Sequence, residues 1–171
     1  SGLAIDADLR WYLFLCAIKR GVLGASDIDA ELARDNTAHG KQNAAYAFAA
    51  IPTADSKSKA FTSVVNENLS NTIHAYTCRG FNLPLHSHLL EPFVDQYFAM
   101  LNVLWKEKGF EIAEATAILT FPTFVISDST LAKAQDWLDV TGKDSAGALR
   151  RVVAEGRDAL ARALKAQKCD K

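Results

Sequence analysis

The stretch from Asp144 to Lys168 limits the possible folds most strongly, because its apolar residues repeat with the period of an α-helix and little interrupts them. One face of this helix would carry Leu149, Val152, Val153, Gly156, Leu160, Ala163 and Leu164. The opposite face would carry Arg151, Glu155, Asp158, Arg162 and Lys165. Mixed charges at a spacing of four are typical of a solvent-exposed helix face. The pattern therefore predicts a long amphipathic helix that packs against other helices on one side.

Two arginines of this stretch, Arg150 and Arg157, lie seven residues apart on the flank of the apolar face. No acidic residue of the same helix is placed to pair with them, so we expect their partners to lie on other segments. Pairing with carboxylates of adjacent helices is one interpretation. Binding of a ligand is the other, because a guanidinium group donates several hydrogen bonds in a fixed fork.

Composition favours one globular domain that covers residues 1–171. Of the 171 residues, 49% are hydrophobic and 23% are charged, which is ordinary for a folded domain. The formal net charge is −1 and the signs are interspersed, so we expect neither nucleic acid nor an anionic membrane as a partner. The longest apolar run, residues 11–18, is far shorter than the roughly 20 residues of a membrane span.

The three cysteines, Cys16, Cys78 and Cys169, are odd in number and widely spaced. This pattern predicts free thiols in a reducing compartment, and hence a cytoplasmic protein. The sequence begins with Ser1 rather than methionine, which leads us to expect a piece of a longer polypeptide.

Helical periodicity and capping residues predict an all-α fold of about nine helices. They run through residues 9–20, 27–35, 41–51, 57–68, 71–80, 93–109, 110–121, 128–140 and 144–168. The predicted N-terminal caps are Asp6 or Asp8, Ser26, Thr37, Thr53 and Ser70. Residues 123–126 are the only strand-like stretch. Short connections favour stacked antiparallel pairs, as in a HEAT-like α-solenoid, with a compact bundle as the alternative.

The first of these helices is apolar almost all round, from Trp11 to Ile18. A helix of this kind is expected to lie between neighbours rather than on a surface. The same reasoning applies to residues 93–109 and favours the solenoid over the bundle.

No motif in the chain predicts catalysis. His-Glu-x-x-His, a Gly-rich phosphate loop and a Gly-x-Ser-x-Gly turn are all absent from the sequence. His86, His88 and Glu91 form the nearest approach to a metal-binding cluster, although a polar loop is the better interpretation. His74 and Cys78 lie four residues apart, on one helix face, and a buried pair is a better account of them than a nucleophile and its base. We therefore expect no catalytic residue, no metal and no cofactor in this chain.

Several phrases together resemble the C-terminal helical domain of the aminopeptidase N family of zinc metallopeptidases, especially its bacterial cytosolic members. They are LRW (9–11), ELARDNTAHG (31–40), AAIPTADSKSKAF (49–61), GF (80–81), LLEPFVDQYF (89–98), LTFP (119–122) and ALRRVVAEGRDALARALKAQ (148–167). No single phrase is diagnostic, but their order and spacing cover nearly the whole chain.

The resemblance implies a non-catalytic domain that encloses the active site of a zinc-dependent aminopeptidase and contacts the distal part of its peptide substrate. In that family a β-rich domain and a thermolysin-like catalytic domain precede the helical one, so the catalytic domain and peptides are the implied partners. Zinc would belong to the full-length parent. On this interpretation Arg150 and Arg157 would bind the peptide's C-terminal carboxylate or its carbonyl groups. A free-standing α-solenoid that binds other proteins is the alternative.

Overall fold

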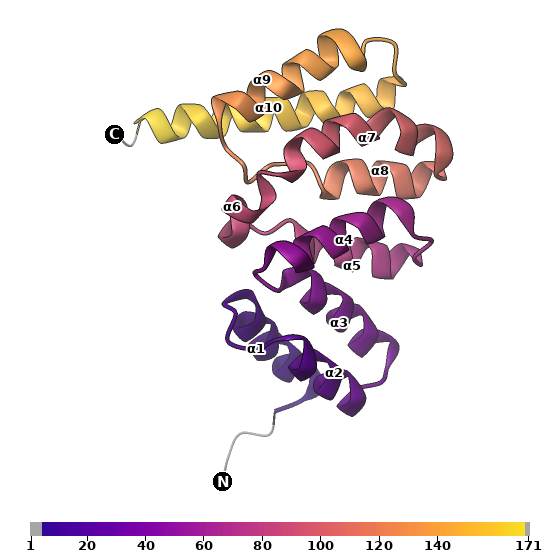
Figure 1. Ribbon diagram of the computed structural model, residues 1–171, viewed down its shortest axis with the longest axis vertical. Coiled ribbons are helices and arrows are strands. Elements are labelled where there is room, and N and C mark those ends of the chain that lie inside the picture. The colour runs from indigo at the N-terminus through magenta and orange to yellow at the C-terminus, as the bar shows by residue number, and fades with distance from the viewer. Residues whose placement is uncertain (1–4, 170–171) are drawn as a thin grey trace. The chain divides into compact units, whose positions relative to one another are not determined.

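The computed structural model describes residues 5–169, and these residues form helices and connections without a β-strand (Figure 1). The α-helices are α1 (Ala7–Lys19), α2 (Ala25–Arg34), α3 (Ala38–Ala50), α4 (Ala54–Asn66), α5 (Asn71–Phe81), α6 (Ser87–Leu90), α7 (Phe93–Glu107), α8 (Phe110–Leu119), α9 (Asp128–Asp136) and α10 (Gly147–Cys169). A 3₁₀ turn, η1 (Pro84–His86), precedes α6, and a π-helical turn, η2 (Trp137–Thr141), follows α9. The predicted all-α class is confirmed. The strand-like residues 123–126 lie in a connection between α8 and α9.

Most predicted helix starts are correct because a side chain caps the backbone there. Asp6, Thr37, Thr53 and Ser70 each accept a hydrogen bond from the backbone N–H three residues later. The predicted cap at Ser26 is wrong. Helix α2 begins two residues earlier than predicted, with Gly24 at the cap, where the Asp27 carboxylate accepts from the Gly24 N–H at 2.8 Å. The four-residue helix α6 is not among the nine helices that the sequence predicts.

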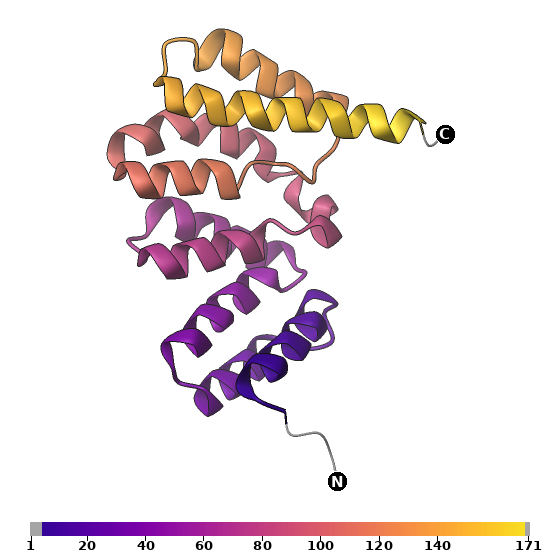
Figure 2. The same ribbon diagram turned by 180° about the vertical axis from the view of Figure 1, so that it is seen from behind.

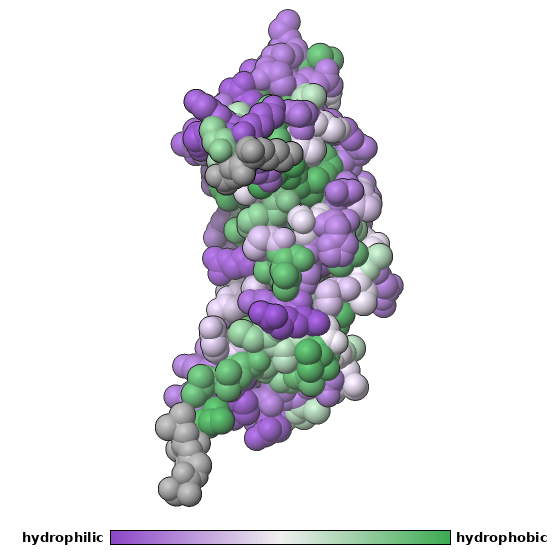
Figure 3. Space-filling model, turned by 90° about the vertical axis from the view of Figure 1, so that its left-hand side faces the viewer, coloured by the Kyte–Doolittle hydropathy of each residue, from purple (hydrophilic) through white to green (hydrophobic). Residues whose placement is uncertain are grey.

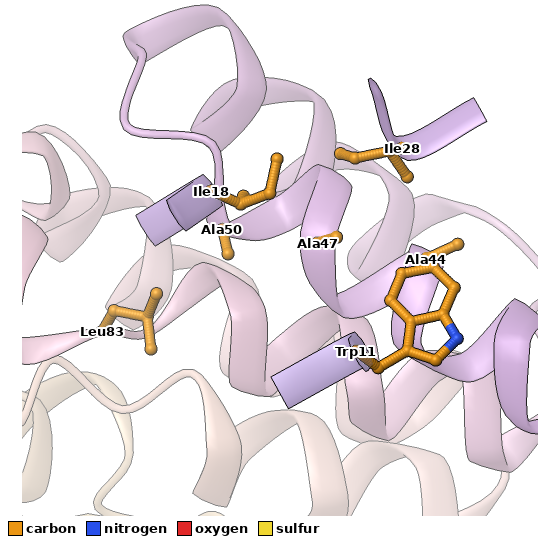
Figure 4. Packing of buried hydrophobic residues seen from close by; sticks show 7 residues of the cluster. All are labelled: Trp11, Ile18, Ile28, Ala44, Ala47, Ala50 and Leu83. Atoms are coloured by element: carbon orange, nitrogen blue, oxygen red, sulfur yellow. The ribbon is translucent and has the colours of Figure 1, made fainter. Parts of the chain in front are cut away.

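The chain divides into two compact units, Ser1–Leu85 (unit 1) and His86–Lys171 (unit 2). In unit 1, helix α3 packs against α1, α2, α4 and α5. Its Ala- and Gly-rich sequence permits these close approaches. At the crossing with α5, a Cβ atom added to Gly80 would lie 2.2 Å from the Tyr46 carbonyl oxygen. Figure 4 shows part of the core, formed by Trp11, Ile18, Ile28, Ala44, Ala47, Ala50 and Leu83.

Asp35 fixes the connection between α2 and α3. Its carboxylate accepts hydrogen bonds from Thr37 Oγ1 and from Trp11 Nε1, both at 2.8 Å. These hydrogen bonds, with that from Thr37 the stronger influence, lower the pKa of the Asp35 carboxyl below its ordinary value. The buried indole of α1 is thereby tied to the start of α3.

Helix α1 corrects one expectation. Trp11 and Ile18 are 1% and 0% exposed, but Tyr12 is 65% exposed and Leu13 is 50% exposed. Within the described residues the helix is therefore buried on one side only, and not enclosed by neighbours as its all-round apolar sequence predicts.

Unit 2 packs α7 against α8 and α9, and α10 against α8 and α9. The predicted apolar face of α10 is confirmed, since Leu149, Val152, Val153, Leu160 and Leu164 are all buried. The charged residues predicted on the opposite face are all exposed. Gly156 lies against the ring of Phe121, where an added Cβ atom would come within 2.4 Å of it. That ring makes an edge-to-face contact with Tyr97, at 5.5 Å between ring centroids.

Consecutive helices lie side by side as pairs within each unit, namely α4 with α5, α7 with α8, and α9 with α10 (Figures 1 and 2). The sequence predicts such pairing of neighbouring helices. The HEAT-like α-solenoid architecture and the single domain over residues 1–171 stay predictions. Hydrophobic and hydrophilic side chains are interspersed on the face drawn in Figure 3. Between residues 5 and 169 no helix combines the length and apolarity that a membrane span requires.

Candidate functional site

Arg150 binds the end of the helix that precedes its own. Its Nη1 donates to the carbonyl oxygens of Leu138 at 2.8 Å and Gly142 at 2.7 Å. Both carbonyls belong to the π-helical turn and the residue after it, where the backbone has acceptors that no regular helical N–H satisfies. A cation placed at the C-terminal end of a helix is stabilising. The partner of Arg150 therefore lies on another segment, as expected, but it is main-chain oxygen and not a carboxylate.

Arg157 lies on the same face of α10 as Arg150, and it contacts both α9 and a residue of its own helix. Its Nη1 donates to Gln135 Oε1 at 2.6 Å, and its Nη2 lies 2.8 Å from Asp158 Oδ1. The expectation that no acidic residue of the same helix pairs with it is wrong. Adjacent side chains on a helix point in different directions. The arginine side chain is long and flexible enough, however, to bring its guanidinium group back to the Asp158 carboxylate. Among the described residues its buried Nε has no hydrogen-bond partner.

A groove of about 640 Å³ runs between α7 and α9 in unit 2. Phe98, Ala99, Ala132 and Trp137 give it an apolar floor. Charges of both signs stand at its rim, where Lys133 pairs with Asp95. Such a surface can hold an extended peptide through apolar contacts and ion pairs.

Sequence reasoning missed Lys57 of α4, the most deeply buried charged residue between residues 5 and 169. Its side chain is 0% exposed, and Nζ donates to the carbonyl oxygens of Ala49 at 2.8 Å, Gly80 at 2.9 Å and Phe81 at 2.9 Å. These carbonyls stand at the C-terminal ends of α3 and α5. Burial lowers the pKa of Lys57 to about 7. The three acceptors oppose that shift, because only the ammonium form has three N–H donors.

The signal that identifies Lys57 is its place in the helical period. It precedes Ala60, Phe61 and Val64 by three, four and seven residues, and all three are buried. A lysine in the apolar face of a helix either lays its methylene stem along the apolar surface and extends its ammonium group into water, or pairs that group with buried acceptors. The carbonyl groups that bind it come from other helices, so sequence alone does not identify them.

His74 and Cys78 form the buried pair that the sequence predicts. His74 Nε2 lies 3.3 Å from the Val64 carbonyl, which can only accept, so this nitrogen carries the proton. The Cys78 Sγ lies 3.8 Å from His74 Nδ1. Burial raises the pKa of the Cys78 thiol to about 12, so the thiolate needed of a nucleophile is not formed near neutral pH.

His86, His88 and Glu91 do not converge. His86 is 2% exposed, whereas His88 and Glu91 are exposed. More generally, the part of the chain that the structure describes holds no group of three or more His, Cys, Asp or Glu side chains arranged to bind a metal ion. Within residues 5–169 the side chains are therefore not arranged as a zinc site.

Comparison with known proteins places this helical chain among domains of larger polypeptides. The family described as the ERAP1-like C-terminal domain matches residues 1–162. An aminopeptidase N from Streptomyces lividans is 36% identical over an alignment that covers 99% of this chain. The chain spans 20% of the length of that relative. The resemblance to the C-terminal domain of the aminopeptidase N family is thus confirmed.

Proposed function

Because the chain belongs to the ERAP1-like C-terminal domain family, we propose that it is the non-catalytic C-terminal helical domain of a zinc-dependent aminopeptidase of the aminopeptidase N type. The family match over residues 1–162 is the observation that carries this proposal. The parent enzyme would release N-terminal residues from peptides. The helical domain would wall the chamber in which the peptide is cleaved, excluding substrates that do not fit.

The chemistry of this enzyme belongs outside these 171 residues. A zinc ion supplies an activated water at neutral pH and polarises the scissile carbonyl. The His-Glu-x-x-His pattern that binds such an ion is not in this sequence. The role of this chain is then to shape the space around the peptide, and the preceding catalytic domain is its partner within the same polypeptide.

Contact with the distal part of the peptide remains a prediction for Arg150 and Arg157. The Nη1 groups of both arginines are engaged by α9 or the turn after it, which supports a structural role for these residues. If they also bind peptide, replacing Arg150 by alanine in the full enzyme should weaken the binding of long peptides more than the binding of short chromogenic substrates. Arg162→Ala, on the exposed face of the same helix, is the control. Equal effects on both substrate lengths would remove the peptide-binding role.

We also propose that the enzyme is cytoplasmic. The three thiols are free, and an odd set of unpaired cysteines is typical of proteins kept in a reducing compartment. Detection of the labelled full-length protein in separated cell fractions tests this proposal. Recovery of the protein outside the cytoplasmic fraction would contradict a cytoplasmic location.

The decisive experiment is to read the parent gene upstream of this region. The proposal requires His-Glu-x-x-His followed by a zinc-binding glutamate, and the purified parent should hydrolyse aminoacyl substrates in a zinc-dependent manner. The 171-residue chain alone should show no such activity after contaminant controls. A parent gene without a metalloprotease module would favour the alternative, a protein-binding α-solenoid.

A further inference from the structure

Helix α1 carries a second apolar stripe on the side away from its core. Leu9, Tyr12, Leu13 and Cys16, here called the outer stripe, are spaced by three, four and seven residues and so lie on one helix face. Trp11 and Ile18 lie on the opposite face and are buried. Leu13 is 50% exposed, and Leu9 and Cys16 are partly exposed. A helix on the surface of a self-contained domain normally has polar residues on this face.

A groove of about 460 Å³ between α1 and α2 adjoins the outer stripe. Leu13, Phe14 and Leu23 are among its lining residues. Three of the charged residues beside it are paired with one another, because buried Glu31 accepts from Arg10 and also lies 3.5 Å from Arg34. The apolar side chains of this surface, in contrast, remain exposed to solvent in the described part of the chain. An apolar ridge next to a groove is the shape into which another helix packs.

We propose that the outer stripe and its groove are the docking surface for a helix of the same polypeptide that lies outside these 171 residues. The proposal rests on the proposed function, which makes this chain part of a longer enzyme. The match covers 20% of the length of the aminopeptidase N, so most of that relative is available to supply the covering helix. The backbone enters α1 at Ala7, beside this surface, so a preceding helix needs only a short connection to reach it.

Cys16 provides a direct probe of this contact, because it belongs to the outer stripe. Cys78 is buried and its thiol pKa is raised to about 12, so it should not react. Cys169 is exposed and can be removed as Cys169→Ser. In that background we expect N-ethylmaleimide to modify Cys16 in the 171-residue chain. In the longer polypeptide the modification should be at least tenfold slower, because a packed helix excludes the reagent.

Two matched variants make the result specific. Leu13→Lys places a charge within the contact and should restore fast modification of Cys16 in the longer polypeptide. Val103→Lys is the control, because Val103 of α7 is 53% exposed, close to the value for Leu13, but lies outside the outer stripe. It should leave Cys16 protected. The melting temperature of the short chain, measured for both variants, verifies that neither substitution unfolds it.

Equal rates of Cys16 modification in the short and long polypeptides would overturn the docking proposal. Protection that appears in the short chain alone, and grows with its concentration, would also overturn it by identifying a second copy as the occupant. Neither result bears on the proposed function, which depends on the metalloprotease module and the activity of the parent.

Discussion

Replacing Lys57 by methionine tests whether one buried ammonium group holds the ends of two helices. Methionine keeps an unbranched stem of similar length and a similar helix propensity, so packing of α4 should change little. The three carbonyl oxygens that Nζ now binds, at 2.8 to 2.9 Å, would remain buried without this donor. Each acceptor left unsatisfied costs about 1–3 kcal/mol. Taking the lower limit for all three gives a loss of about 3 kcal/mol in the free energy of unfolding.

Urea denaturation followed by far-ultraviolet circular dichroism measures this loss. Lys59→Met is the matched control, because Lys59 lies on the same helix, is exposed, and pairs with Asp55 four residues earlier. An exposed pair of this kind contributes about 0.3–0.5 kcal/mol. A free energy of unfolding of Lys57→Met within about 1 kcal/mol of the wild-type value, with an unchanged denaturant slope, would contradict this expectation. Water would then be satisfying the carbonyls, and the lysine would not be holding the two helix ends.

Three further outcomes follow from other contacts. Gly156→Ala should destabilise the chain by about 1–3 kcal/mol in thermal or urea unfolding, because its methyl group would overlap a buried phenylalanine ring. Gly147→Ala, which meets no atom within 4 Å, should instead be neutral or stabilise by up to about 1 kcal/mol; equal destabilisation by both would contradict the overlap. Because hydrogen bonds lower the pKa of Asp35 in the folded state, its contribution to stability is present above its unfolded pKa and lost as the pH falls through the folded value. The stability difference between wild type and Asp35→Asn should therefore shrink on acidification below about pH 4, and a constant difference would be inconsistent with this. Arg150→Ala should lower the free energy of unfolding by about 2 kcal/mol through loss of two charge-assisted hydrogen bonds, whereas Arg162→Ala should have almost no effect.

Helix positions could be predicted from the sequence where local chemistry determines them. Thr37, Thr53 and Ser70 cap helices as expected because each hydroxyl meets a backbone N–H only three residues away. The buried face of α10 could be predicted for the same reason, since one period decides which residues share it. At α2, glycine and serine both suit a cap, and the Asp27 carboxylate settles the choice in favour of Gly24.

The contacts of Lys57 and Arg150 could not be predicted, because their partners are backbone carbonyl groups brought together by packing. Lys57 binds carbonyls that are 8, 23 and 24 residues away in the sequence. The Arg150 contact depends on the π-helical turn, which no periodic pattern in residues 128–140 indicates. Under the proposed docking, a helix outside these 171 residues covers the outer stripe of α1, so the apolar sequence of α1 and its exposure are not in conflict.

The π-helical turn Trp137–Thr141 also sets how this part of the chain tolerates changes in length. The Gly142 N–H bonds to the Trp137 carbonyl five residues back, so the turn holds one residue more than an α-helical turn would. The Thr141 carbonyl then accepts from Asn102 of α7, while the Leu138 and Gly142 carbonyls accept from Arg150 of α10. Shortening the turn by a single amino acid should rotate these oxygens by about 100° and so break the hydrogen bonds to Asn102 and to Arg150 together. The wide turn thus provides hydrogen-bond acceptors to both α7 and α10. Insertions or deletions elsewhere on the surface of unit 2 should be far better tolerated than one within this turn.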